Sequence, residues 1–131
     1  MHKKFLVIAA LLGALSVALG AFAAHSLKVI LETEVLQIFE TGVKYQMYHT
    51  LALLAVGILL QQSATKQLKW AGNFFIAGII LFSGSLYLLC YIKHMGISAT
   101  WVGAITPLGG ICFIAGWIMM AIGVGRKATT A

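Results

Sequence analysis

The sequence predicts an all-α, polytopic membrane protein: a single transmembrane domain, residues 1–131, folded as a bundle of four transmembrane helices. Hydrophobic residues make up 61% of the chain and charged residues only 9%. A helix rising about 1.5 Å per residue needs roughly 20 apolar residues to cross about 30 Å of hydrocarbon, and four stretches approach that length. Their backbone groups cannot stay unpaired in lipid, so each stretch is expected to be helical. The expected spans are residues 5–24, 44–61, 71–92 and 104–124.

The first span begins like a secretory signal, with two lysines, an apolar run and the small-residue pattern Ala21-Phe22-Ala23. Its apolar run of about 20 residues is longer than the usual signal core of about 7–15, so we expect a retained helix. Small residues recur along it every four positions, which is typical of close contact with another helix or another protomer. These packing candidates are Ser16, Gly20 and Ala24.

The connection between spans one and two is expected to hold a short external amphipathic helix. Its apolar residues repeat at helical spacing: Leu31, Val35, Ile38 and Phe39. Thr33 is a plausible N-cap for a helix that begins at Glu34. We expect this helix to lie at the interface and to bend into span two near Gly42. An ordered packing loop is the alternative.

The outer part of span two carries the most polar candidates. Tyr45 and His49 are four residues apart, so they share a helical face. Ionisable groups at membrane depth usually have a partner and often a function. If the outer ends of spans one and two meet, His25 approaches this face. The candidate polar cluster is His25, Glu40, Tyr45, Gln46 and His49. It fits a proton-responsive switch, a metal site, or a structural role in which histidine bonds a backbone carbonyl.

Spans three and four carry a second polar set. Ser83, Ser85, Tyr87 and Thr106 are candidates for a membrane polar lining, although serine hydroxyls commonly bond back to their own helix. In span four, Pro107 is expected near the helix start, where its missing N–H costs nothing. Helix-packing glycines recur there every seven residues: Gly109, Gly116 and Gly123. Cys90 and Cys112 are packing residues or a disulfide pair, and the sequence leaves both readings open.

The net charge of +6 does not indicate nucleic-acid binding, because the basic residues are scattered in ones and twos. Sorting them by connection is more informative. One side holds Lys3, Lys4, Lys66, Lys69, Arg126 and Lys127. The other side holds Lys28, Lys44 and Lys93, together with all three acids, Glu32, Glu34 and Glu40. The bias toward basic cytoplasmic loops therefore predicts that both termini face the cytoplasm.

The sequence contains none of the motifs that mark common catalytic or metal sites. There is no HExxH, no CxxC, no paired carboxylate and no Gly-rich loop after a strand. No nucleophile is accompanied by an evident base and orienting group. We therefore predict no catalytic residue, no metal site and no cofactor.

Five segments together resemble one small family of four-span membrane proteins. They are Gly20-Ala-Phe-Ala-Ala-His25, Thr41-Gly-Val-Lys-Tyr-Gln-Met-Tyr-His49, Leu81-Phe-Ser-Gly-Ser-Leu-Tyr87, Thr106-Pro-Leu-Gly-Gly110 and Ala115-Gly-Trp117. The chain resembles the bacterial family known as domain of unknown function 423, whose eukaryotic relatives are the transmembrane protein 256-like proteins. One departure is Ala23, where members commonly carry glycine. The resemblance implies a multi-pass protein of the bacterial cytoplasmic, or inner, membrane and supplies no mechanism.

Three functional hypotheses follow, with the lipid bilayer as a partner in each. The leading one is a non-enzymatic protein that acts through helix contacts, as an assembly or stabilising subunit or as a small homo-oligomer. The first alternative is a small oligomeric transporter or channel for protons, ions or a small solute. The second is a metal-, haem- or quinone-linked role that uses His25 and His49.

Overall fold

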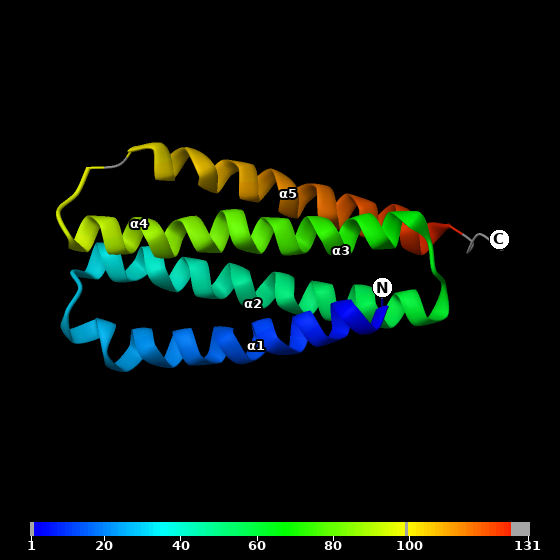
Figure 1. Ribbon diagram of the computed structural model, residues 1–131, viewed down its shortest axis with the longest axis horizontal. Helices are drawn as coiled ribbons and strands as arrows, with labels where there is room; N and C mark the ends of the chain where they lie inside the picture. The colour runs from blue at the N-terminus through cyan, green and yellow to red at the C-terminus, as the bar shows by residue number, and fades with distance from the viewer. Residues whose placement is uncertain (1, 99, 127–131) are drawn as a thin grey trace.

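The computed structural model describes residues 2–98 and 100–126, and every regular element in them is helical (Figure 1). Two short non-α turns interrupt or flank the α-helices: η1 is a 3-10 turn and η2 is a π turn. The order along the chain is α1 (His2–His25), η1 (Leu27–Val29), α2 (Thr33–Gln62), α3 (Lys66–Gly78), η2 (Ile79–Ser83), α4 (Gly84–His94) and α5 (Thr100–Gly125).

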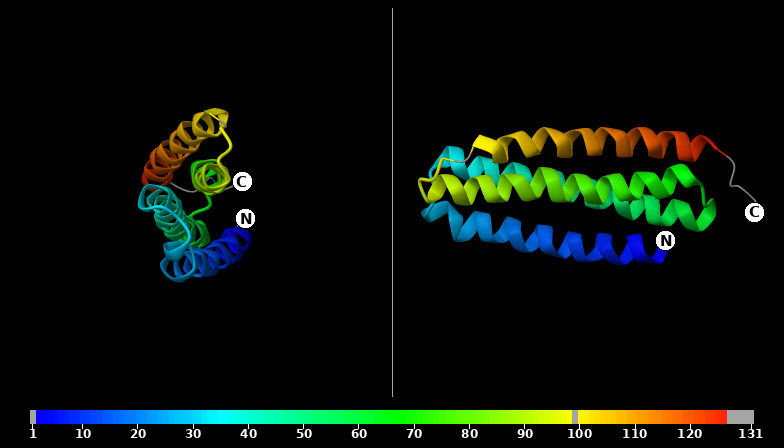
Figure 2. Two further views of the ribbon diagram at one scale, coloured as in Figure 1. Left: turned by 90° about the vertical axis from the view of Figure 1, so that its left-hand side faces the viewer. Right: turned by 45° about the horizontal axis from the view of Figure 1, so that its top comes forward.

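These elements form four rods, each long and apolar enough to cross a membrane. α3, η2 and α4 run on from one another as a single rod, Lys66–His94. Consecutive rods are antiparallel, so α1 begins and α5 ends at the end of the bundle where α2 is joined to α3 (Figure 1). α2 and the α3–η2–α4 rod lie in the middle, and α1 and α5 flank them on opposite sides (Figures 1 and 2). The expected four-span fold is confirmed.

The prediction of a separate amphipathic helix between spans one and two is wrong. α2 is one continuous helix of 30 residues from Thr33, with Glu32 rather than Thr33 at its N-cap. Gly42 lies within this unbroken helix and is not a bend; a Cβ there would meet the side chains of Tyr87 and Leu86. Phe39 is buried with Ala23 and Cys90 in an apolar cluster. Packing against α1 and α4 therefore holds this segment in line with the membrane span.

The other spans are longer than the hydrophobic patterns suggested. Each extends past its apolar run into flanking polar or charged residues, because helical hydrogen bonding continues beyond the hydrocarbon. α5 begins at Thr100, so Pro107 lies inside the helix and not near its start as expected. Its missing N–H leaves the carbonyl of Gly103 without the usual helical donor. Cys90 and Cys112 are both free thiols.

Three glycines of α5 form a seam against the α3–η2–α4 rod. A Cβ at Gly116 or Gly123 would press on Phe75 or Leu68, and one at Gly109 would overlap the Phe82 backbone and side chain. The opposing residues, Leu68, Phe75 and Phe82, are themselves seven positions apart. Two antiparallel helices with matching heptad spacing therefore fit large side chains onto bare backbone along most of their length.

The same kind of contact joins α1 to its neighbours. Leu6 of α1 covers Gly57 of α2, and Phe5 covers Gly72 of α3. Further along, Gly20 faces Val43, with 3.6 Å from a built Cβ to the nearest side-chain carbon. The expected small-residue face of α1 shifts at its end, because Ala23 is buried while Ala24 is exposed. A helix of 3.6 residues per turn drifts away from a strict four-residue repeat, which accounts for the shift.

We predict opposite outcomes for alanine at two adjacent glycines of α5. Gly109→Ala places a methyl group on the Phe82 backbone, whereas Gly110→Ala meets no atom within 4 Å. Overpacking at a tight contact costs about 1–3 kcal/mol, while alanine at an open helical position is neutral or slightly favourable. Denaturant titration in detergent micelles should show a lower unfolding midpoint for Gly109→Ala alone. Equal midpoints would contradict the seam.

Candidate functional site

His49 lies in a buried aromatic pocket between α2 and α5. Its ring stacks on Phe113, with ring centroids 3.5 Å apart and an 8° angle between the planes. The Nδ1 atom is 2.7 Å from the carbonyl oxygen of Tyr45, and Trp117 Nε1 donates to Nε2 over 3.2 Å. A carbonyl only accepts and an indole N–H only donates. The hydrogen bonds therefore assign a neutral imidazole that carries its proton on Nδ1.

Gln46 joins three helices at the centre of the bundle. It is 2% exposed. Its Nε2 donates to the carbonyl of Leu12 on α1 over 3.1 Å, and its Oε1 accepts from Tyr87 Oη on α4 over 2.7 Å. Ser16 Oγ donates to the same Leu12 carbonyl over 2.8 Å. A buried amide without partners would be costly in lipid, so this network holds α1, α2 and α4 in one register.

The hydroxyls of η2 and α4 also bond across helices. Ser83 Oγ donates to the Gly42 carbonyl of α2 over 2.7 Å. Ser85 Oγ donates to the Phe82 carbonyl over 2.8 Å and lies 2.6 Å from Thr106 Oγ1 on α5. Because a hydroxyl has a single proton, Thr106 donates to Ser85 in this arrangement. The side chains of the four residues suggested as a polar lining are therefore hydrogen-bonded to other helices or within η2 and α4.

The five residues of the expected polar cluster are not brought together. His25 is exposed, and its Nδ1 lies 2.9 Å from the Ala21 carbonyl of its own helix. Thr50, beside His49, packs on Gly13, which precedes His25 by twelve residues or about 18 Å of helix. The two histidines are thus at different depths. The expectation was wrong because α2 starts near the turn and carries His49 far down the bundle.

Glu40 and Tyr45 lie among other residues and not beside His25. Glu40 lines a hollow of about 270 Å³ between α1 and α2, together with Lys44 and Gly20. Tyr45 lies over the outer side of the His49 pocket, and its ring contacts Phe82 with centroids 4.6 Å apart and a 31° angle between the planes. Among residues 2–98 and 100–126, no three His, Cys, Asp or Glu side chains come together in a way that would hold a metal ion.

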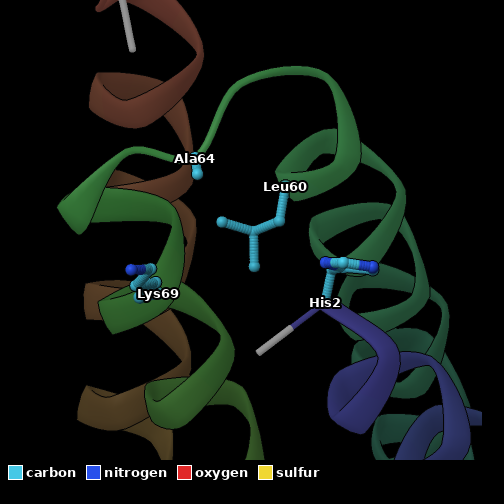
Figure 3. Close-up of a pocket in the computed structure, with 4 residues that line it drawn as sticks. All are labelled: His2, Leu60, Ala64 and Lys69. Atoms are coloured by element: carbon cyan, nitrogen blue, oxygen red, sulfur yellow. The ribbon is translucent and has the colours of Figure 1, made fainter. Parts of the chain in front are cut away.

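Another hollow, of about 160 Å³, lies where α1 begins and α2 turns into α3. Leu60 projects between His2 of α1 and Lys69 of α3, and Ala64 lies above it in the connection (Figure 3). No acidic residue lies in or beside the α2–α3 connection or in the first residues of α1. The hollow therefore has a positive rim over an apolar floor, as expected at the end of the bundle that carries most of the lysines.

Sequence analysis missed three features of this core. Trp117 and Phe113 complete the His49 pocket, and Thr50 is buried with no hydrogen-bond partner for its hydroxyl among the described residues. One signal was present for Trp117. It lies in the middle of a span rather than near a membrane interface, and a tryptophan N–H at that depth needs an acceptor. No comparable signal marks Phe113 among the other apolar residues of α5.

The comparisons with known proteins agree on one family. The family described as "Protein of unknown function (DUF423)" matches residues 19–110. A Haemophilus influenzae protein of the UPF0382 membrane protein group is 46% identical over 126 residues, covering 94% of both chains. The Bacillus subtilis membrane protein YwdK is 44% identical over 92% of this chain and 94% of its own. The Escherichia coli inner membrane protein YgdD is 39% identical over 96% and 93%. No solved structure matches the fold.

We predict that His49→Ala destabilises the protein and that His25→Ala does not. The first change empties the space beside Phe113 and removes the acceptor of the Trp117 N–H. Together these losses should cost about 2–4 kcal/mol. The second change removes only an exposed contact within α1, worth less than about 0.5 kcal/mol. Unfolding midpoints in detergent, measured side by side, test the difference. A midpoint of His49→Ala equal to that of His25→Ala would contradict the buried pocket.

Proposed function

The chain belongs to the DUF423 family of bacterial membrane proteins, and from that premise we propose that it acts without enzymatic chemistry, through contacts of its outer helix faces with other membrane helices. It is a multi-pass integral protein of the bacterial inner membrane with four transmembrane helices. The proposed role is that of an assembly or stabilising subunit, or of a small homo-oligomer. The connection between α2 and α3, residues 63–65, is three residues long and too short to hold a soluble domain.

One observation carries the proposal: α5 presents bare glycines outward. A Cβ at Gly103 or Gly110 would meet no atom within 4 Å, in contrast to the three inward glycines of the same helix. Glycine lowers helix stability by about 0.8–1.0 kcal/mol relative to alanine, and lipid contact alone gives nothing in return. Close approach of a second helix compensates for this loss of stability, because it brings backbone atoms of the two helices into contact. The neighbouring Ile111 and Ile114 are 62% and 63% exposed and would pack around such a contact.

The other two hypotheses have less support from the arrangement of side chains. A transporter would use Tyr87 and the serines of η2 and α4 as a path, but each of these groups is hydrogen-bonded to another helix. Their partners are the Gly42 carbonyl for Ser83, Thr106 for Ser85 and Gln46 for Tyr87. A metal, haem or quinone role that paired His25 with His49 would need them at one depth. In the described structure both nitrogens of His49 already have partners.

We also propose that both termini face the cytoplasm. The support is the charge pattern: Lys3, Lys4, Lys66, Lys69 and Arg126 flank one end of the bundle, and every carboxylate side chain belongs to residues near the other. Single cysteines should report the orientation in a background with Cys90 and Cys112 replaced by alanine. A membrane-impermeant maleimide applied to spheroplasts is expected to label Ser26→Cys and to spare Gln62→Cys. Labelling of Gln62→Cys alone would reverse the orientation.

Cysteine crosslinking tests the helix-contact proposal. In the same background, Gly110→Cys and Leu11→Cys each place one thiol on an outward face, on α5 and on α1. Mild oxidation of native membranes should convert Gly110→Cys to a disulfide-linked dimer or a larger product with another protein. Leu11→Cys should stay monomeric, since its 66% exposed side chain is flanked one turn away by Val7 and Leu15 rather than by glycine. If both variants remained monomeric at native expression, the proposal would be abandoned.

A further inference from the structure

Two adjoining hollows lie at the end of the bundle where α1 turns into α2 and α4 ends. The first, of about 170 Å³, has walls that are almost wholly apolar, including Phe22, Phe39, Cys90 and Tyr91. The second, of about 180 Å³, is lined by polar atoms, with Glu32 from the start of α2 and Lys93 from the end of α4. Leu31 and His94 line both hollows, so the apolar space and the polar one lie side by side.

The position of these hollows matches the interface of a bilayer. Tyr91 is 60% exposed at the end of α4, and Trp101 is 60% exposed at the start of α5. Exposed aromatic residues at the ends of spans lie at the level of lipid headgroups. The apolar hollow is therefore on the hydrocarbon side and the polar hollow on the headgroup side. Such an arrangement suits an amphiphile that lies along the helices.

The charges of the polar hollow select the kind of headgroup. Glu32 offers a carboxylate that only accepts hydrogen bonds, whereas Lys93 offers three N–H donors and His94 at least one. A purely anionic headgroup would be repelled by Glu32, and a purely cationic one by Lys93. A headgroup with one phosphate and one protonated amine satisfies both sides.

We propose that these adjoining hollows bind one phospholipid with a phosphate and a primary ammonium group, the phosphatidylethanolamine class. Lys93 and His94 donate to the phosphate oxygens, and the ammonium group donates to the Glu32 carboxylate. One acyl chain enters the apolar hollow between Phe22 of α1 and Cys90 of α4. The inference is independent of the proposed contacts of α5, because the residues that line the two hollows belong to α1, α4 and the segment from η1 into α2.

Phosphatidylcholine provides the sharpest comparison. It has the same phosphate and the same net charge, but its quaternary ammonium has no N–H to donate to Glu32. The full-length protein, purified in detergent and incubated with equal amounts of phosphatidylethanolamine and phosphatidylcholine of matched chains, is examined by native mass spectrometry. We expect about fivefold more protein to retain phosphatidylethanolamine, the factor that corresponds to one hydrogen bond with a net value of about 1 kcal/mol.

Three substitutions separate the parts of the site. Glu32→Gln should bring the ratio of the two retained lipids to about one, because the ammonium loses its charged acceptor. Lys93→Met should lower retention of both lipids and leave their ratio unchanged, because both have the phosphate. Cys90→Phe should also lower retention of both, by filling the apolar hollow. Glu34→Gln is the matched control, since Glu34 is exposed two residues from Glu32 and lines neither hollow.

Unfolding midpoints of all four variants are measured in the same detergent, so that a loss of lipid is interpreted only for protein that remains folded. A folded wild-type protein that retained the two lipids equally would overturn the proposal. So would a Glu32→Gln variant that kept the wild-type preference, or a Glu34→Gln variant that lost it. If Cys90→Phe does not fold, Leu27→Phe fills the same hollow from η1 and takes its place.

Discussion

Close contact between large side chains and bare glycine backbone is the constraint on which this bundle depends. Helices in lipid gain nothing from burying apolar surface against one another, since the lipid tails are equally apolar, so association relies on tight packing and hydrogen bonds. Gly109, Gly116 and Gly123 let α5 approach the α3–η2–α4 rod along their shared length. Gly57 and Gly72 let α1 approach from the other side. A methyl group at Gly109 would overlap backbone atoms of Phe82, and one at the other positions would force the opposing residue to move.

The polar side chains of the core reinforce this packing and fix its register. Gln46 bonds α1 and α4 at once, Ser83 ties η2 to α2, and Ser85 ties α4 to α5. The π turn η2 lies where Phe82 meets Gly109, and Ser83 at its end donates to the carbonyl of Gly42. Few of these polar atoms remain for a ligand. The proposed function is therefore assigned to the outer faces and the ends of the bundle and not to its centre.

The outer regions differ from one another in chemistry. One end carries most of the lysines around an apolar-floored hollow, and the other combines a carboxylate and an ammonium beside an apolar slot. α5 adds a face with two open glycines. We propose zwitterionic lipid for the second of these hollows and a neighbouring helix for the face of α5, as two separate contacts of one small bundle.

The sequence by itself determined the fold class, the four spans and the packing glycines of α5, because the bilayer requires long apolar helices and because small residues mark where helices approach. It also identified Gln46 and His49 as polar residues in need of partners. Only the tertiary structure decided what those partners are. The hydrophobic pattern could not show that α2 continues unbroken to Thr33, which separates His49 from His25 in depth. Likewise, helix register makes Trp117 the partner of His49 and the Leu12 carbonyl the partner of Gln46. That register depends on contacts between residues far apart in the chain.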